Sequence, residues 1–208
     1  MPVIAGADEC GYGALAGPVF FGGAVAEEAA MAHFVCKDSK KYSSNVARMM
    51  RDACQDRGTG GVLAECVYSI SANDVCRVGY MTALSLGFHV IAYRLRDRVC
   101  PYFPRIILDG SKDFGVYHAK AIVKADDKVK VVSFASVVGK LEQKRFMGIA
   151  HKRFPEYSFM DHAGYGTGRH INAIRQHGVV PGLHRIPVIA PMFKARGWRL
   201  HTRIEMWG

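Results

Sequence analysis

The stretch VIAGADECGYGALAGPV, residues 3–19, places two neighbouring acids, Asp8 and Glu9, at the end of an apolar segment and follows them with a glycine-rich turn. The apolar residues 3–7 and 19–25 are typical of buried strands, and their short connection predicts an antiparallel hairpin. Carboxylates at the end of a buried strand are costly unless a partner or a metal compensates their charge. The stretch therefore predicts the first hairpin of a sheet and a chemical site at its end.

Beyond this hairpin, apolar segments with β-branched residues alternate with segments whose apolar residues recur at helical spacing. This alternation predicts an α/β domain. We expect strands at residues 61–71, at 105–110 and from 119; a helix from Ser43 or Ser44 to about Asp56; one or two helices within 72–98; and a helix from about Val129. After residue 155 we expect loops and short helices, and the basic, aromatic residues 194–208 either pack on the domain or reach a ligand.

The charge of the chain favours a polyanionic partner. Over 208 residues the formal net charge is +10, and the isoelectric point is about 9.4. A basic surface attracts nucleic acid, although a soluble basic protein without such a partner has the same charge. The length suits one well-buried domain rather than two.

Cysteine usage indicates a reducing compartment. The six cysteines, at positions 10, 36, 54, 66, 76 and 100, are scattered and form neither a CxxC motif nor a zinc-type pattern with histidine. Free buried thiols are the expected state. The N-terminus has no signal-peptide pattern and the apolar runs are too short for a membrane span, so we expect a cytoplasmic protein without a membrane partner.

Acids end apolar segments at three places: Asp8 with Glu9, Asp109, and Asp126 with Asp127. One such acid is usually a turn residue or a helix cap. Three in one basic protein instead suggest a cluster, because sites form at strand ends of α/β sheets and gathered carboxylates need a cation. Mg²⁺ prefers oxygen ligands, and two such ions can stabilise both oxygens of an in-line phosphoryl displacement. This pattern fits a metal-dependent nuclease.

Short motifs across nearly the whole chain resemble those of the ribonuclease HII family, and they occur in the family's order. They are ADECGYGALAGPV at residues 7–19, DSKKYS at 38–43, ILDGSK at 107–112, IVKADDK at 122–128, ASVVGK at 135–140 and HAGYGTGRH at 162–170, followed by His184-Arg185 and Pro191. Each motif alone is a weak signal, and the ordered set is specific.

The resemblance implies an RNase H-like fold, with a mixed central sheet flanked by helices and a C-terminal helical and loop part. Residues 1–208 are then a single domain, with a catalytic core at about 1–150 and a substrate-contacting part at about 151–208. The resemblance also implies a monomer that works in DNA replication and repair. Its implied reaction is hydrolysis of the RNA strand of RNA–DNA duplexes and nicking 5′ of ribonucleotides embedded in DNA, leaving 3′-hydroxyl and 5′-phosphate ends.

Residue-by-residue matching to the family assigns the catalytic and metal-binding roles. The four acids are Asp8, Glu9, Asp109 and Asp126, and the implied cofactor is Mg²⁺ or Mn²⁺, as two ions. Asp127 stands where alanine is usual in the family and competes with Asp126 for the fourth place. The histidines of the later motifs are expected to be structural or to contact substrate, because hard ions prefer oxygen ligands; they are His162, His170 and His184.

The implied substrate contacts come from several motifs. Backbone amides near Gly11 and Gly13 are expected at the ribose 2′-hydroxyl, and Tyr165 is expected on the sugar beside the cleavage junction, unless it packs as a turn tyrosine. The phosphate-binding candidates, whose alternative is a solvated helix start, are Ser39, Lys40, Lys41 and Ser43. Lys140 and Arg185 either reach the nucleic-acid backbone or form structural salt bridges.

The main departure from the family is Tyr12, because Gly-Tyr-Gly replaces Gly-Arg-Gly. The family's arginine helps to recognise the RNA–DNA junction, and tyrosine lacks its forked cation. Tyr12 can stack on the substrate or simply pack. Ribonuclease HIII also lacks this arginine, and it cuts hybrids but is poor at a single embedded ribonucleotide.

Three hypotheses remain open at this point. The first is an endoribonuclease acting on RNA–DNA hybrid and on ribonucleotide-containing duplex DNA, with either HII-like or hybrid-only, HIII-like specificity. The second is a structure-specific DNA nuclease of the same fold superfamily, similar to a junction resolvase. The third is a non-catalytic hybrid-binding module, which the intact acids disfavour. The sequence shows no convincing clamp-binding motif at its C-terminus.

Overall fold

The computed structural model describes residues 2–29, 31, 52, 61–99 and 104–208. Its chain forms two compact units. The first contains Met1–Cys10, Phe20–Tyr68 and Leu84–Glu142, and the second contains Gly11–Val19, Ser69–Ala83 and Gln143–Gly208. Of the predicted helix from Ser43 or Ser44 to about Asp56, the structure describes Asp52 alone, which is helical; the other residues of that range lie outside the described ones.

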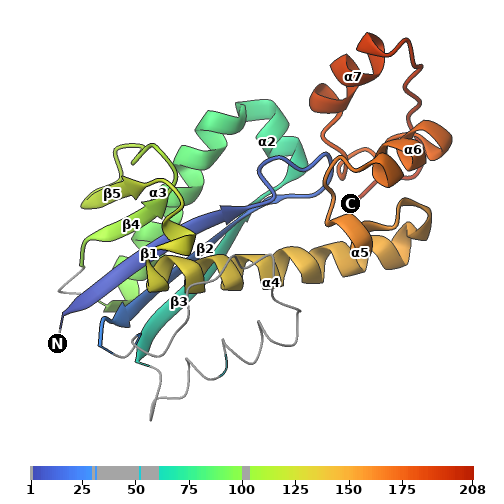
Figure 1. The fold of residues 1–208 in the computed structure, drawn as a ribbon. Coiled ribbons are helices and arrows are strands. Elements are labelled where there is room, and N and C mark those ends of the chain that lie inside the picture. Colours follow the sequence, from blue (N-terminus) through green and yellow to red (C-terminus); the bar gives the residue numbers. More distant parts are fainter. Residues whose placement is uncertain (1, 30, 32–51, 53–60, 100–103) are drawn as a thin grey trace. The chain divides into compact units, whose positions relative to one another are not determined.

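A five-stranded mixed sheet runs through the structure, and its strands are the predicted ones (Figure 1). The spatial order is β3-β2-β1-β4-β5, with β1 antiparallel to β2, β1 parallel to β4, and β4 parallel to β5. The strands are β1 (Val3–Cys10), β2 (Val19–Glu27), β3 (Val62–Ile70), β4 (Ile106–Asp109) and β5 (Ala119–Ile122). The predicted hairpin and the α/β class are both confirmed.

β1 is longer than the apolar residues alone predict. Its pairing with β2 continues through Asp8 and Glu9 as far as Cys10, which lies opposite Phe20. The alternation of apolar and polar residues therefore underestimates the strand, because hydrogen bonds to β2 hold the backbone extended beyond the last apolar residue. As a result, both acids lie within the sheet and not in the loop after it.

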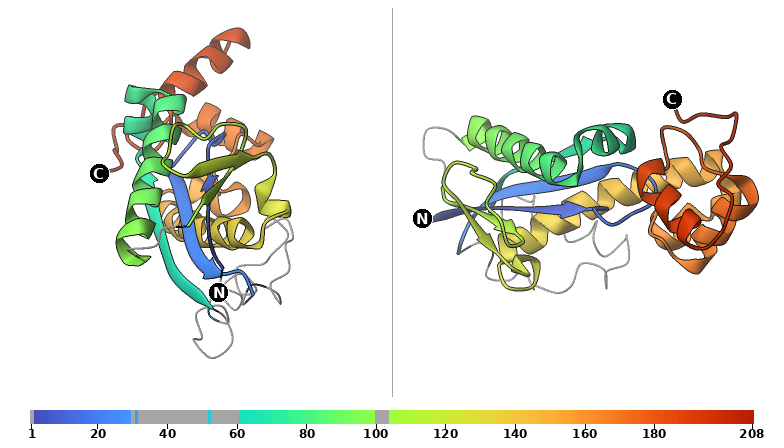
Figure 2. Two further views of the ribbon diagram at one scale, coloured as in Figure 1. Left: turned by 90° about the vertical axis from the view of Figure 1, so that its left-hand side faces the viewer. Right: turned by 90° about the horizontal axis from the view of Figure 1, so that it is seen from above.

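Helices cover both faces of the sheet in the first unit, as Figure 2 shows for α3 (Tyr80–Val99) and α4 (Lys130–Arg153). Neighbouring strand residues point to opposite faces of a sheet. In β2, Gly22 therefore faces α4 and Gly23 faces α3. A Cβ on Gly22 would lie 2.0 Å from the Ala135 carbonyl oxygen of α4, and a Cβ on Gly23 would lie 2.4 Å from the Ile91 side chain of α3. Glycine at these positions lets both helices approach the sheet closely.

Residues 72–98 were expected to form one or two helices, and they form two. The first is α2 (Ala72–Val78), which Ser71 caps by accepting a hydrogen bond from the Asp74 amide, and the second is α3. Gly79 separates them with a φ of +83°, a conformation that glycine adopts without strain. Within the described ranges, no single helix is both long and apolar enough to cross a membrane.

The C-terminal part of the second unit contains the predicted short helices. They are η4 (Pro155–Tyr157), α5 (Phe159–His162), α6 (Gly168–His177) and α7 (Ile186–Ala195). Their core contains Phe154, Tyr157 and Phe159, all fully or almost fully buried. Trp198, Leu200 and Trp207 pack against that core, so the basic, aromatic C-terminal segment is part of the second unit's packing.

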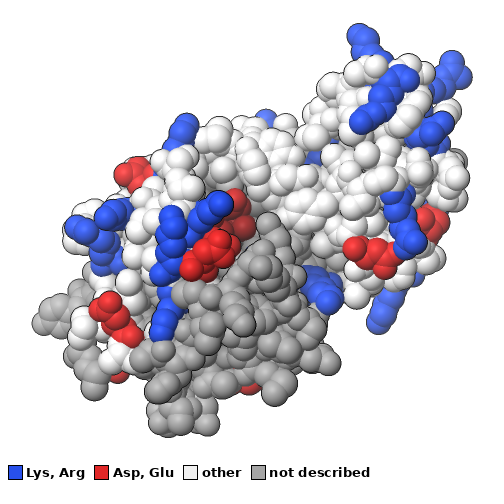
Figure 3. Space-filling view, in the orientation of Figure 1, with Lys and Arg blue, Asp and Glu red and all other residues white. Residues whose placement is uncertain are grey.

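The surface is basic, in keeping with the net charge of +10. On the face drawn in Figure 3, Lys and Arg side chains are spread over the described surface, and Asp and Glu form fewer groups. The thiols of Cys10, Cys66 and Cys76 are free, as expected. The other three cysteines are outside the described residues.

Candidate active site

Parallel pairing of β1 with β4 brings acids from distant parts of the sequence together. Ala7 pairs with Leu108, so the next residues along the two strands are Asp8 and Asp109. Ligand oxygens of Asp8, Glu9 and Asp109 all lie within 4.8 Å of one another. These three residues form the carboxylate cluster, and it lies entirely within the first unit.

Asp8 is the most enclosed member of the carboxylate cluster, with 4% of its surface exposed. Burial, together with the charges of Asp109 and Asp126, raises the pKa of Asp8 to about 6, although a hydrogen bond with the Ser136 side chain and the charge of Lys140 act in the opposite direction. Ser136 and Lys140 are four residues apart on α4 and so lie on one helix face. The approach of α4 to the sheet at Gly22 therefore supplies both compensating groups.

Glu9 is more strongly perturbed. Burial, followed by the charge of Asp8, raises the pKa of Glu9 from 4.5 to about 8. The Glu9 amide donates to Oδ1 of Asp8 at 2.8 Å, which fixes one oxygen of that carboxylate. Without a cation the cluster resists full ionisation at neutral pH, because each carboxylate disfavours the charge of the next. A divalent ion with oxygen ligands would relieve this repulsion, so the donor set fits such a metal.

The Asp109 carboxylate is oriented by a short turn later in the chain. Its Oδ1 accepts a hydrogen bond of 2.6 Å from the Ala125 amide, at the start of the 3₁₀ helix η3 (Ala125–Asp127). Asp126 and Asp127 both lie in η3. Asp127 is exposed, whereas burial and then the charge of Asp109 raise the pKa of Asp126. Of the two rivals, Asp126 therefore lies in the field of the carboxylate cluster, although it is outside the three-residue group itself.

The loop after β1 belongs to the second unit and carries the Gly-Tyr-Gly departure. The Tyr12 side chain is 41% exposed, and its ring packs edge-on against Tyr80 with the centroids 5.0 Å apart. Tyr165 is 39% exposed and forms an antiparallel bridge with Ala14. The second unit thus brings two predicted substrate-binding tyrosines to exposed positions on paired segments.

The remaining predicted substrate residues differ in their surroundings. Arg185 is fully buried, and its guanidinium donates to backbone carbonyls of the loop at residues 11–17. Lys140 lies beside the carboxylate cluster, where it lowers the pKa of Asp8. The candidates Ser39, Lys40, Lys41 and Ser43 fall outside the described residues.

Comparison with known proteins gives the relationship of this chain. Residues 5–190 match the family model described as Ribonuclease HII. This chain belongs to the ribonuclease HII family. It is a type 2 ribonuclease H, an endonuclease. Among its relatives, ribonuclease HII of Hydrogenovibrio crunogenus is 30% identical over 183 residues, which are 88% of this chain and 84% of the relative. That of Helicobacter pylori strain G27 is 32% identical over 190 residues, covering 88% and 89% of the two chains.

Solved structures of related enzymes share the fold and confirm its RNase H-like class. The crystal structure of ribonuclease H2 from Pyrococcus horikoshii matches with a TM-score of 0.69 and 21% identity over 93% of this chain and 98% of that chain. The ribonuclease HII in the PCNA complex from Archaeoglobus fulgidus matches with a TM-score of 0.68 and 21% identity, over 83% of this chain and 85% of that chain. Bst-RNase HIII in complex with Mn²⁺ matches with a TM-score of 0.64 and 19% identity, over 84% of this chain and 62% of that chain.

The three histidines of the enzyme's later motifs form a buried cluster, and their hydrogen bonds indicate the tautomers of His170 and His184. Nδ1 of His170 lies 2.9 Å from the Tyr165 carbonyl and must donate to it, which leaves Nε2 as an acceptor. Nδ1 of His184 accepts from the Val180 amide, so its Nε2–H donates to His170 across 3.2 Å. His162 stacks on His170 at 4.5 Å. Burial lowers the pKa of His170 to about 4 and that of His184 to about 3, so both stay neutral. His170 holds the Tyr165 carbonyl directly, and His184 holds the His170 ring.

Two contacts, one in each unit, involve residues that are absent from the sequence-based predictions. Ser136 lies in the ASVVGK motif, but only the packing of α4 shows that its hydroxyl binds Asp8. Tyr80 gives no local signal, since it lies in no motif and reaches Tyr12 through the fold alone. Both roles depend on contacts between residues far apart in the sequence.

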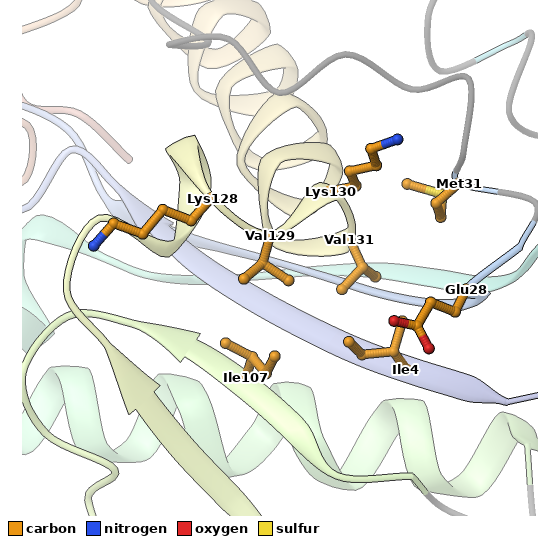
Figure 4. A pocket seen from close by; sticks show the side chains of 8 residues that line it. All are labelled: Ile4, Glu28, Met31, Ile107, Lys128, Val129, Lys130 and Val131. Carbon is orange, nitrogen blue, oxygen red and sulfur yellow. The ribbon is translucent and has the colours of Figure 1, made fainter.

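A pocket of about 450 Å³ lies elsewhere in the first unit (Figure 4). Its apolar lining includes Ile4, Ile107 and Val131, and Nζ of Lys128 at its margin donates to the Val123 carbonyl at 2.7 Å. None of the described residues that line it belongs to the carboxylate cluster. The pocket is therefore separate from the candidate active site.

Proposed function

We propose that this enzyme hydrolyses the RNA strand of RNA–DNA duplexes and nicks duplex DNA 5′ of an embedded ribonucleotide, using two divalent ions, Mg²⁺ or Mn²⁺. The products are 3′-hydroxyl and 5′-phosphate ends. The proposed ligands are the carboxylate cluster and Asp126. The Mn²⁺ complex of Bst-RNase HIII, an enzyme of similar fold, supports metal use.

The observation that carries this proposal is the carboxylate cluster itself. Three ligand oxygens within 4.8 Å, in surroundings that raise the pKa of Asp8 to about 6 and of Glu9 to about 8, form a site whose acids are poorly compensated by the protein alone. Carboxylates whose charge is disfavoured by burial and by one another are typical of a site that a bound cation completes.

In the proposed reaction, some residues of the chain bind the metal ions and others orient these ligands. Asp8, Glu9 and Asp109 supply oxygen ligands from two adjacent strands, which keeps their spacing fixed. The Ala125 amide and the Ser136 hydroxyl each orient one of these carboxylates. When bound, the metal ions supply the charge that activates a water and stabilises the leaving oxygen.

Cleavage of three labelled duplexes, each with Mg²⁺ and with Mn²⁺, tests the proposal. They are an all-RNA/DNA hybrid, a DNA duplex with one ribonucleotide, and plain DNA. We expect cutting of the first two and none of the third. Cutting of the hybrid alone would limit the enzyme to HIII-like specificity, and cutting of plain or branched DNA would favour a structure-specific DNA nuclease.

Two matched variants test the metal ligands in the same assay. Asp109→Asn should lower kcat on the order of 100-fold or more while hybrid binding is retained. Asp97→Asn, which alters an exposed acid of α3, should leave cleavage unchanged. Robust turnover by Asp109→Asn would contradict the ligand assignment.

A further inference from the structure

Arg185 is a buried charge without an acidic partner among the residues that the structure describes. Its side chain has no exposed surface, and burying an unpaired charge is costly unless oxygen acceptors surround it. Here Nε and Nη2 donate to the Gly17 carbonyl at 3.0 and 2.8 Å, and Nη1 donates to the Tyr12 carbonyl at 2.7 Å. The guanidinium therefore joins both ends of the loop at residues 12–17.

Tyr80 completes this arrangement. Its hydroxyl accepts a further hydrogen bond of 3.2 Å from Nη1 of Arg185, and the guanidinium carbon lies 5.6 Å from the centre of its ring. The same ring meets the Tyr12 ring edge-on at an interplanar angle of 72°. Tyr12 is thus held twice, at its carbonyl by Arg185 and at its ring by Tyr80.

Further backbone bonds connect this loop to the segment that carries Tyr165. The Leu15 amide donates to the Gly164 carbonyl at 2.8 Å, and the Arg185 amide donates to the Leu15 carbonyl at 2.8 Å. A Cβ on Gly13 would lie 4.0 Å from the Tyr165 ring, so nothing bulky separates the two segments there. One hydrogen-bonded frame within the second unit therefore holds the exposed rings of Tyr12 and Tyr165.

We propose that Arg185 and Tyr80 are positioning residues that hold the Tyr12 ring ready to stack on a nucleotide of the bound duplex. Tyr12 then contributes a flat aromatic face where the family's arginine contributes a charged fork. Stacking surfaces are effective when they are rigid before binding, because less entropy is lost. This inference rests on the proposed function and deepens it, since it assigns a contact for the substrate.

Kinetics with whichever ribonucleotide-containing duplex the wild-type enzyme cuts best test this inference. Tyr12→Ala should raise KM about tenfold, the lower part of the range for loss of one stacked base, with kcat within about twofold. Tyr12→Phe keeps the ring and should stay within about twofold of wild type. Tyr12→Arg should steepen the salt dependence of KM by close to one unit in log–log slope, since it adds one phosphate-binding charge.

A double-mutant cycle separates positioning from general stability. Tyr80→Leu should raise KM like Tyr12→Ala, and the double variant should be no worse than either single variant, because Tyr80 acts through the Tyr12 ring. Tyr93→Leu, at an exposed tyrosine of α3, is the matched control and should not change KM. Melting temperatures show whether each variant is folded, and Arg185→Lys, which cannot form the fork, should reproduce the KM effect if it folds.

Additive effects of Tyr12→Ala and Tyr80→Leu on KM, or equal losses of kcat in both, would overturn the positioning role. So would a Tyr12→Ala enzyme with wild-type KM. These outcomes differ from failure of the proposed function, in which the wild-type enzyme itself would cut no ribonucleotide-containing duplex with Mg²⁺ or Mn²⁺.

Discussion

Replacing Glu9 with glutamine should stabilise the metal-free protein while abolishing cleavage. Burial and the Asp8 charge raise the pKa of Glu9 from 4.5 to about 8. At pH 7 the folded chain keeps Glu9 protonated, whereas the unfolded chain ionises it and gains free energy. At 1.36 kcal/mol per pH unit between pH 4.5 and pH 7, folding loses about 3 kcal/mol at this residue.

The direction of the pH dependence follows from the two pKa values. Between pH 4.5 and about pH 8 the native state binds this proton more often than the unfolded state, so stability falls as pH rises through that window. Glutamine does not titrate and resembles the protonated acid. The Glu9→Gln variant should therefore gain up to about 3 kcal/mol at pH 7 and less than about 1 kcal/mol at pH 5.

Urea unfolding followed by circular dichroism, in EDTA at both pH values, measures this difference. Glu28→Gln, at an exposed glutamate of the same unit, is the control and should change stability little. Addition of Mn²⁺ should stabilise the wild type by ligand linkage and the variant less. A Glu9→Gln protein that is no more stable than wild type in EDTA at pH 7, or that gains equally at both pH values, would refute the reasoning.

Three further predictions concern other residues of the two units. Asp126→Asn should lose on the order of 100-fold in kcat, since Asp126 is half-buried and the charge of Asp109 raises its pKa, whereas Asp127→Asn, at an exposed side chain, should lose less than about threefold. Duplex cleavage measures both. Burial lowers the pKa of His170 from 6.5 to about 4, so the unfolded state binds the extra proton as pH falls. The stability advantage of wild type over His170→Gln should shrink by about 2 kcal/mol from pH 7.5 to pH 5, measured by urea unfolding. Gly22→Ala should destabilise the protein by about 3 kcal/mol, because its Cβ would meet the backbone of α4.

Each of these predictions has a clear contrary outcome. Equal loss of activity in the two aspartate variants would remove the distinction between Asp126 and Asp127. A pH-independent difference between wild type and His170→Gln would mean that His170 is not held neutral by burial. Gly168→Ala, where an added Cβ meets nothing within 4 Å, is the control for Gly22→Ala, and equal effects would contradict close packing of α4 on β2.

The sequence by itself determined the class of the fold and the family. Strand and helix periods predict the α/β alternation, and the hairpin at residues 3–25 follows from two apolar segments around a short loop. These properties are local, so they can be recognised without a structure. The length of β1 depends partly on its pairing with β2, which is a non-local contact. The apolar pattern predicts too short a strand, because this pairing extends β1 through Asp8 and Glu9.

Tertiary structure decided how the predicted residues meet. The register of β1 against β4 places Asp8 next to Asp109, and the close approach of α4 at Gly22 brings Ser136 and Lys140 to the same carboxylate. Arg185 shows the same dependence: its sequence context suits substrate binding or a salt bridge, whereas its guanidinium binds a carbonyl 168 residues away. Residue chemistry is written in the sequence, but which donor meets which acceptor depends on packing between distant segments, which no local pattern encodes.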